Sequence, residues 1–400
     1  MMKKPELLAP VGGADKLPYA LHFGADALYL AGKNFGLRAF CDNFSDEELF
    51  AAVKTAREKG KKVYVTINIF AKNADFGQLK DFLHTVKKAG ADAVIVSDAG
   101  VVDFIRKNQP DLEIHLSTQA NTTNKYAVRF WGETGVKRVV LARELGLDEI
   151  KEIKDFVGDE VELEAFVHGA MCISYSGRCL LSTYLTPRDS NRGECVQACR
   201  WEYEIGEKNR EGRLTLAEDG RGSYILNSKD MNTMPILDKI IDAGVSSLKI
   251  EGRMKTAYYV GAVVRAYRKR IDDYFDGKTY DKELERELDK VSHREYTTGF
   301  YLGQAEQCYE TSKPENEYRY CADVLGYDEE NGMLEIVQRN RFYSTDELET
   351  VSVTENKTLC PKEIYDEYGN RVEDCKLVMQ KLFVKTDVRL EKYDMLRKRI

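Results

Sequence analysis

The stretch Gly90–Ser97, with the sequence GADAVIVS, contains the end of one helix followed at once by an apolar strand. A glycine in this position adopts the left-handed conformation that ends a helix, and the apolar run suits a strand covered on both faces. The same pattern recurs at Gly24–Asp26, Gly135–Lys137 and Gly244–Ser246, each time just before an apolar run. Repeated units of this kind predict an α/β fold built on a parallel sheet.

Eight apolar segments are strand candidates, and they are Leu7–Val11, Ala27–Ala31, Val63–Ile69, Ala93–Ser97, Ile114–Thr118, Val139–Ala142, Val161–Val167 and Leu248–Glu251. Helix-like stretches lie between them, for example Asp46–Lys59, which Ser45 and Glu48 open as a capping box. Eight such units predict a TIM-type barrel, regular or irregular. An open doubly wound sheet is the alternative, although Pro10–Gly13 lacks the spacing of a dinucleotide-binding fingerprint.

Three regions differ from the barrel repeat. Residues 172–230 form a Cys-rich insertion followed by hairpin signals, and residues 276–317 predict a helical linker after a long helix at Thr256–Phe275. Residues 318–400 switch to alternating patterns at Tyr320–Leu325, Met333–Gln338, Glu347–Val353 and Val372–Leu382. We therefore expect a barrel over residues 1–275 and a small antiparallel β-barrel domain over residues 318–400.

The composition limits the class of protein. The chain has 400 residues, of which 43% are hydrophobic, so it can form a large core. The net charge of −7 argues against a protein that coats nucleic acid non-specifically, but it leaves a local basic patch open. No apolar segment resembles a signal peptide or a membrane span. We expect a cytoplasmic protein with reduced thiols and no membrane partner.

Four of the nine cysteines gather in the insertion, at Cys172, Cys179, Cys195 and Cys199. Soft thiolates favour zinc, copper(I) or an iron–sulfur cluster. A structural zinc site usually has two close cysteine pairs, whereas only one pair is close here. The irregular, Gly- and Ser-bearing spacing favours an iron–sulfur cluster, with structural zinc, a redox or nucleophilic cysteine and plain core residues as alternatives. The scattered Cys41, Cys308, Cys321, Cys360 and Cys375 are expected to be small buried hydrophobes.

The position of Cys172, just after the seventh predicted strand, favours an active site. In TIM-type barrels the carboxyl ends of the strands carry the catalytic groups. Other polar side chains expected at this end are Arg38, Arg143, Glu251 and Arg253, and arginine suits the bidentate binding of carboxylate or phosphate. His168 is a candidate general base, or else a histidine satisfied by its neighbours. The common zinc-protease and serine-hydrolase motifs are absent.

The range Glu164–Ser182, EAFVHGAMCISYSGRCLLS, resembles the signature of the peptidase U-32, collagenase-like family. The segments Glu6–Pro10, Lys249–Arg253, Arg294–Phe300 and Asn340–Phe342 are similar to it too. The resemblance implies an oxygen-independent hydroxylase whose four clustered cysteines hold a 4Fe-4S cluster. Members of this kind act on tRNA wobble uridine, on ribosomal RNA cytidine or on a ubiquinone precursor.

The chain length and the stretch Arg192–Trp201 are most similar to the branch that forms 5-hydroxyuridine in tRNA. That branch depends on prephenate, a dicarboxylate, as the hydroxyl source. The resemblance therefore implies the tRNA anticodon region and prephenate as partners. The predicted catalytic residues are His168, Glu251 and Arg253, and the predicted substrate-binding residues are Arg38, Arg143, Arg178 and Arg200. A collagenase-like peptidase and an RNA-binding protein with a structural cluster are the competing functions, and a homo-oligomeric or paralogous partner is left open.

Overall fold

The computed structural model describes residues 3–38, 41–172, 174–201, 205–206, 213–214, 228–305 and 314–400. The hairpin expected over residues 202–227 lies mostly outside this part of the chain. Two short strands of it are described, β8 (Ile205–Gly206) and β9 (Arg213–Leu214), and they pair in antiparallel fashion. Among the described helices, none is long and apolar enough to cross a membrane.

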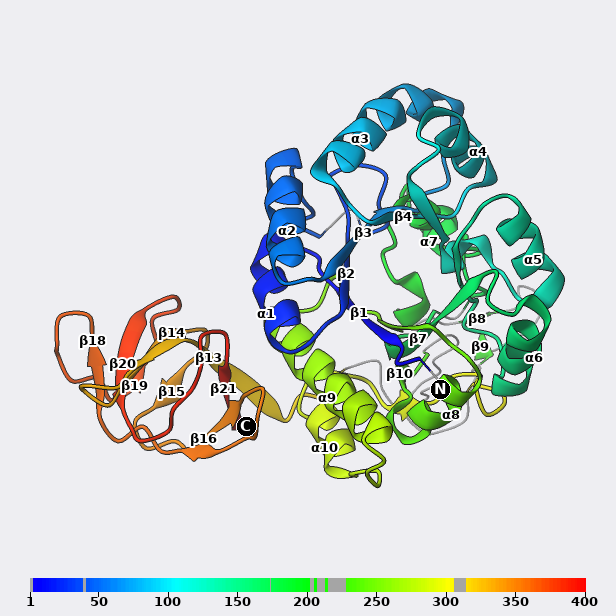
Figure 1. Cartoon of the computed structure of the whole chain (residues 1–400). Helices are drawn as coiled ribbons and strands as arrows, with labels where there is room; N and C mark the ends of the chain where they lie inside the picture. The colour runs from blue at the N-terminus through cyan, green and yellow to red at the C-terminus, as the bar shows by residue number, and fades with distance from the viewer. Residues whose placement is uncertain are drawn as a thin grey trace.

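A closed barrel of eight parallel strands forms the larger part of the molecule (Figure 1). In sheet order the strands are β1 (Glu6–Pro10), β2 (Ala27–Leu30), β3 (Lys62–Ile67), β4 (Ala93–Val96), β5 (Glu113–Leu116), β6 (Arg138–Val140), β7 (Glu162–Ala170) and β11 (Ser247–Ile250). Strand β11 pairs with both β7 and β1, which closes the barrel. The TIM-type fold is thus confirmed, and each of the eight predicted strands is present.

Helices surround the strands on the outside (Figure 1). They are α1 (Leu17–His22), α2 (Asp46–Glu58), α3 (Phe76–Ala89), α4 (Ala99–Asn108), α5 (Lys125–Glu133), α6 (Leu147–Val157), α8 (Leu237–Asp242) and α9 (Ala257–Phe275). The capping box is confirmed, because Ser45 accepts from the Glu48 amide while the Glu48 carboxylate accepts from the Ser45 amide. Gly90 ends α3 with φ +80°, as its place before a strand predicts.

Two short strands extend the barrel sheet beyond β7. Strand β10 (Asp230–Asn232) pairs antiparallel with the carboxyl end of β7, and β12 (Tyr296–Thr297) pairs with β10. Strand β7 also carries a bulge, since Lys249 lies opposite Phe166 while the next residue, Ile250, lies opposite His168. A bulge inserts one residue and changes which way the following side chains point.

A second sheet, wholly antiparallel, forms a domain with its own core. Its strand order is β17 (Thr358–Leu359), β16 (Leu348–Val351), β21 (Met395–Arg399), β13 (Tyr318–Asp328), β14 (Met333–Gln338), β20 (Lys381–Lys385) and β18 (Ile364–Asp366). A separate pair joins β15 (Phe342–Tyr343) and β19 (Asp374–Cys375). The strand expected over Val372–Leu382 is wrong, because the chain turns between β19 and β20, where Met379 has φ +69°.

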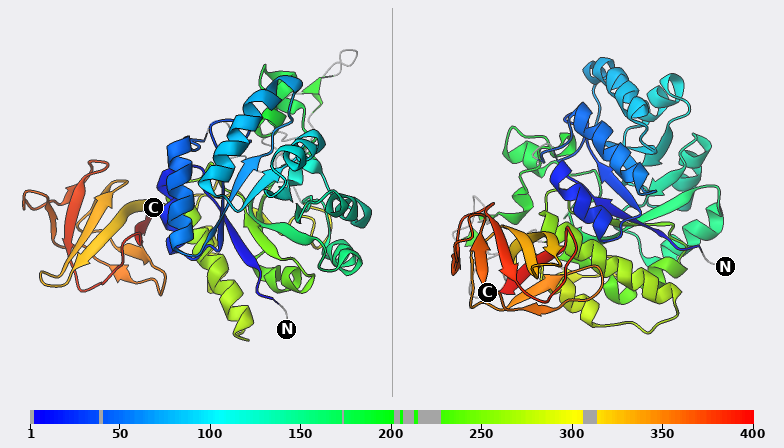
Figure 2. Two further views of the ribbon diagram at one scale, coloured as in Figure 1. Left: turned by 45° about the horizontal axis from the view of Figure 1, so that its top comes forward. Right: turned by 60° about the vertical axis from the view of Figure 1, so that its left-hand side comes forward.

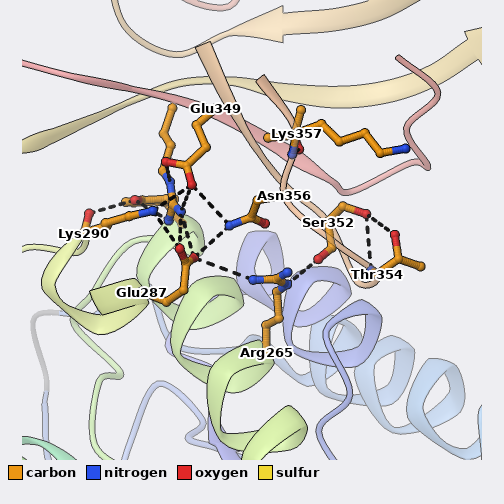
Figure 3. A network of polar contacts seen from close by, with 11 residues as sticks. Arg265, Glu287, Lys290, Glu349, Ser352, Thr354, Asn356 and Lys357 are labelled. Atoms are coloured by element: carbon orange, nitrogen blue, oxygen red, sulfur yellow. Dashed lines mark hydrogen bonds and ion pairs between the residues drawn. The ribbon is translucent and has the colours of Figure 1, made fainter. Parts of the chain in front are cut away.

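The sheet domain lies against the side of the barrel, beside α1 and α9, as Figures 1 and 2 show. A network of charges joins the two parts (Figure 3). Arg397 of β21 is fully buried, and its Nη2 lies 2.7 Å from Glu287 of α10 (Glu283–Asp289) and 2.9 Å from Glu349 of β16. Lys290 bridges the same two carboxylates.

The scattered cysteines divide into different environments. Cys321 and Cys375 are fully buried in the sheet domain, so the prediction of small buried hydrophobes is confirmed for them. It is wrong for Cys360, which is exposed, and Cys41 is only partly buried. Cys308 lies outside the described residues.

Candidate active site at the barrel mouth

The carboxyl ends of the barrel strands surround a cavity of about 140 Å³. All four clustered cysteines border it, together with the predicted Arg38, Arg143, Glu251 and Arg253. The cysteine-bearing segment leaves the end of β7 and passes through the short helix α7 (Leu181–Leu185), whose first residues also border the cavity. One cavity thus brings together residues from segments more than 200 positions apart in the sequence.

Two glycines let this segment pack tightly over the mouth. A Cβ at Gly177 would lie 2.1 Å from the Gln119 carbonyl oxygen, which belongs to the loop after β5. A Cβ at Gly169 would lie 2.4 Å from the Glu251 carbonyl oxygen after β11. Both glycines have positive φ angles, +74° and +107°, which side-chain-bearing residues rarely adopt. Close backbone approach at these two points fixes where Cys172 and Cys179 lie.

The thiols have polar donors around them. Cys172 donates a hydrogen bond to the Cys179 sulfur, which lowers the pKa of Cys179 to about 5 and raises the pKa of Cys172. The Gln197 amide lies 3.4 Å from the Cys195 sulfur, and the Ser182 hydroxyl lies 3.8 Å from it. Burial raises the pKa of Cys199. A set of thiols with N–H and O–H donors suits a ligated metal–sulfur group, because hydrogen bonds to the sulfurs stabilise and tune such a group.

The arrangement of the thiols bears on what they could hold. Across the part of the chain that the structure describes, no three His, Cys, Asp or Glu side chains converge closely enough to hold a single metal ion. A tetrahedral zinc site needs its sulfurs about 2.3 Å from one point. The four thiols instead border a cavity, which fits a larger group bound by sulfur at several of its own metal atoms. The donor set, four thiols on one cavity with N–H and O–H donors beside them, fits an iron–sulfur cluster.

Arginines flank Glu251 at the same mouth. Arg38 lies 3.4 Å from the Glu251 carboxylate, and Arg143 donates to the Ala170 carbonyl at 2.8 Å. Burial alone would raise the pKa of Glu251, but Arg38, Arg143 and Arg253 outweigh it and lower the pKa. Glu251 is thus ionised in a cationic surrounding, where it can accept a hydrogen bond or a proton.

Arg253 is bound by the protein itself. Its side chain is 3% exposed, and its guanidinium donates to Thr66 Oγ1 at 2.9 Å, to the Leu37 carbonyl at 2.6 Å and to Asn43 Oδ1 at 3.0 Å. Two of these acceptors lie on the loop after β2 that carries Arg38. Arg253 therefore holds that loop in place through three hydrogen bonds, which use part of its guanidinium.

His168 does not border the cavity. The bulge in β7 turns its ring away from the cavity, towards Tyr259 and Tyr267 of α9 and Tyr296 of β12, at centroid distances of 5.9, 5.5 and 5.5 Å. It is 1% exposed, and burial lowers its pKa to about 3. The candidate general base is thus placed away from the mouth, for a reason that strand alternation alone does not predict.

Models of known protein families match most of this chain. The family model named Peptidase family U32 matches residues 12–311, and the model of the Peptidase family U32 C-terminal domain matches residues 316–397. The chain belongs to peptidase family U32. The resemblance that the segment Glu164–Ser182 indicates is therefore confirmed.

Relatives in the U32 family carry two kinds of name. "tRNA hydroxylation protein P1" of Bacillus subtilis is 41% identical over 403 residues and covers 99% of this chain and 95% of its own length. "tRNA hydroxylation protein P" of Escherichia coli is 37% identical, covering 88% and 87%. "Collagenase" of Porphyromonas gingivalis is 36% identical, covering 75% and 74%.

Solved U32 structures are also similar. The C-terminal domain of a U32 peptidase from Geobacillus thermoleovorans is 36% identical, with a TM-score of 0.20, and covers 20% of this chain and 99% of that one. The U32 peptidase Mk0906 is 14% identical, with a TM-score of 0.41, and covers 62% of this chain and 93% of that one.

The remaining predicted residues, Arg178 and Arg200, lie around the barrel mouth and do not border its cavity. Arg178 is exposed on the cysteine segment. Arg200 is partly buried, donates to Gln197 at 2.6 Å and lies near the Asp230–Arg294 ion pair. Neither residue borders the cavity as Arg38 and Arg143 do.

Sequence reasoning missed several cavity residues, above all Lys249 and Tyr29. The sequence does indicate a place for Lys249 in the cavity, because Lys249 stands two positions before Glu251 and alternate residues of a strand share a face. No sequence pattern predicts Tyr29 as a cavity residue, because a tyrosine inside an apolar strand is typical of core packing.

Proposed function

We propose that this chain hydroxylates tRNA, forming 5-hydroxyuridine at the wobble position, with a 4Fe-4S cluster held by Cys172, Cys179, Cys195 and Cys199 and with prephenate as co-substrate. The observation that carries the proposal is the placement of these four thiols on one cavity with Arg38, Arg143 and Glu251. The names of the relatives, tRNA hydroxylation proteins matching most of the chain, support the substrate.

Each group at the mouth has a role in this proposal. When bound, the cluster supplies one-electron redox chemistry. Arg38 and Arg143 attract the carboxylates of the co-substrate, and the ionised Glu251 accepts a hydrogen bond or a proton at its carboxylate oxygens. The tight packing at Gly177 keeps the segment of Cys172 and Cys179 closed over the barrel, which limits water at the site.

The nucleotide has to leave its stack to reach this cavity. Tyr175 borders the cavity and is 60% exposed, so its ring offers a surface on which an unpaired base can stack. Arg178, exposed on the same segment, is placed to contact phosphate. Arg178 supplies positive charge beside the cavity, although the net charge of the chain is −7.

The test is mass spectrometry of tRNA nucleosides from a strain that lacks this gene and its paralogues. We expect 5-hydroxyuridine and the groups derived from it to disappear, to return with the wild-type gene and to stay absent with Cys179→Ala. A histidine-dependent peptidase would need other machinery, because none of the described residues that border the cavity is a histidine. If the modification persists in that strain and the purified metal-replete protein cleaves gelatin, the function is that of a peptidase instead.

A further inference from the structure

A row of charged side chains runs through the interior of the barrel. Lys249 on β11, Glu164 on β7 and Arg138 on β6 are 4%, 0% and 4% exposed. The Lys249 ammonium lies 2.8 Å from Glu164 Oε1, and an Arg138 guanidinium nitrogen lies 3.2 Å from Glu164 Oε2. Barrel interiors are ordinarily filled by branched apolar side chains, so this row is unusual.

The charge state of this row follows from its pairing. Burial alone would raise the pKa of Glu164, but Lys249 and Arg138 lower it to about 2. Glu164 is therefore ionised and faces two cations. Buried ion pairs contribute little net stability once their desolvation is counted. Packing alone therefore does not account for a charged lysine at this position.

Lys249 differs from Arg138 in that it borders the mouth cavity. An ammonium has three N–H donors, and among the described residues Glu164 is the one acceptor that Lys249 contacts. The rings of Tyr29 and Phe166 flank the ammonium at 4.6 and 5.5 Å from their centroids. Unused donors that face a cavity between two aromatic rings can bind an anionic group with a planar or cyclic body.

The cations of the cavity lie at two depths. The Lys249 side chain is 5% exposed and belongs to the middle of a barrel strand. The Arg38 side chain is 38% exposed, and Arg143 lies 5.2 Å from the centroid of Phe166. A small molecule inside the cavity can contact both Lys249 and Arg38, because both residues border it.

We propose that Lys249 binds one carboxylate of a small organic dianion, whose second carboxylate lies on Arg38 and Arg143 nearer the surface. The proposal rests on the proposed function, since it gives the co-substrate of that reaction an orientation. Glu164 holds the Lys249 side chain at the border of the cavity through their 2.8 Å contact. The body of the dianion packs between Tyr29 and Phe166, next to the four thiols.

The test is calorimetric titration of the anaerobically purified holoprotein with prephenate, with malonate as a second dicarboxylate and acetate as a monocarboxylate. We expect the wild type to bind the dicarboxylates more tightly than acetate. Lys249→Met should weaken prephenate binding about tenfold to a hundredfold, which is the range for a lost hydrogen bond to a charged group. Lys33→Met, which removes an exposed lysine outside the cavity, should leave binding unchanged.

Lys249→Met leaves the buried Glu164 with one cation fewer, which can destabilise the fold. A second variant therefore serves as a control. Lys249→Met combined with Glu164→Gln removes both charges, and it should also lose prephenate binding while keeping its affinity for an anticodon stem-loop RNA. Unweakened prephenate binding in either variant, or no dicarboxylate binding by the wild type, would overturn the proposal. Because no RNA turnover is measured, a protein that binds prephenate through Lys249 but forms no 5-hydroxyuridine would contradict the proposed function alone.

Discussion

At the scale of single residues, Arg253 and Arg38 have different roles although both border the cavity. Arg253→Lys should lower the free energy of unfolding by about 1–3 kcal/mol, because an ammonium cannot reach Thr66, Leu37 and Asn43 together. Arg38→Lys should leave stability unchanged and raise the KM for the co-substrate. Urea unfolding and steady-state kinetics on both variants check this. The reverse pattern would support the predicted catalytic role of Arg253.

The burial of His168 can be tested by the pH dependence of the free energy of unfolding. Its folded pKa, about 3, lies below the ordinary value, so the unfolded chain binds a proton that the folded chain refuses. The stability associated with neutral His168 is present above about pH 6.5 and is lost as the pH falls towards 3. We expect His168→Gln to flatten the fall in unfolding free energy between pH 6.5 and 4 by up to about 1.4 kcal/mol per pH unit. Identical slopes would mean that His168 is accessible to solvent.

At the scale of elements, much of the barrel is predictable, because apolar strands alternate with helices, several of which end at a glycine such as Gly90. The eight strands and the capping box at Ser45 follow from local patterns alone. The bulge in β7 does not, since it arises from pairing with β11, which is far away in the sequence. That bulge is why His168 lies beside Tyr259 and Tyr267 and not among the residues that border the cavity. The acceptors of Arg253 were equally unpredictable, because they lie on the loop after β2 and on β3, both far from Arg253 in the sequence.

The cysteine segment offers a matched pair of glycine substitutions. Gly177→Ala should lose the cluster while far-ultraviolet circular dichroism stays near that of the wild type, because its Cβ would meet the Gln119 carbonyl. Gly158→Ala has a positive φ too, +55°, but open space around it. It should cost about 1–3 kcal/mol in unfolding free energy, because of its backbone angles alone, and keep the cluster. Equal cluster content in the two variants would show that the tight packing does not position the thiols.

At the scale of the whole molecule, the buried network around Arg397 joins the sheet domain to the barrel (Figure 3). Arg397→Met should lower the free energy of unfolding by about 3–5 kcal/mol, because Glu287 and Glu349 lose their buried partner. Arg399→Met, two residues further along β21, removes an exposed ion pair with Glu317 and should change stability by less than about 1 kcal/mol. Thermal unfolding and limited proteolysis compare the two variants. Equal stabilities would mean that the network does not hold the two parts together.

The central claim is that the four thiols at the barrel mouth hold a 4Fe-4S cluster. The most direct measurement is iron and acid-labile sulfide analysis of the anaerobically purified protein, with its visible absorption spectrum. We predict roughly four irons and four sulfides per chain and broad absorption near about 400 nm. Cys172→Ala, Cys179→Ala and Cys195→Ala should each lose this signal, and Cys41→Ala should keep it. Stoichiometric zinc without sulfide would contradict the account.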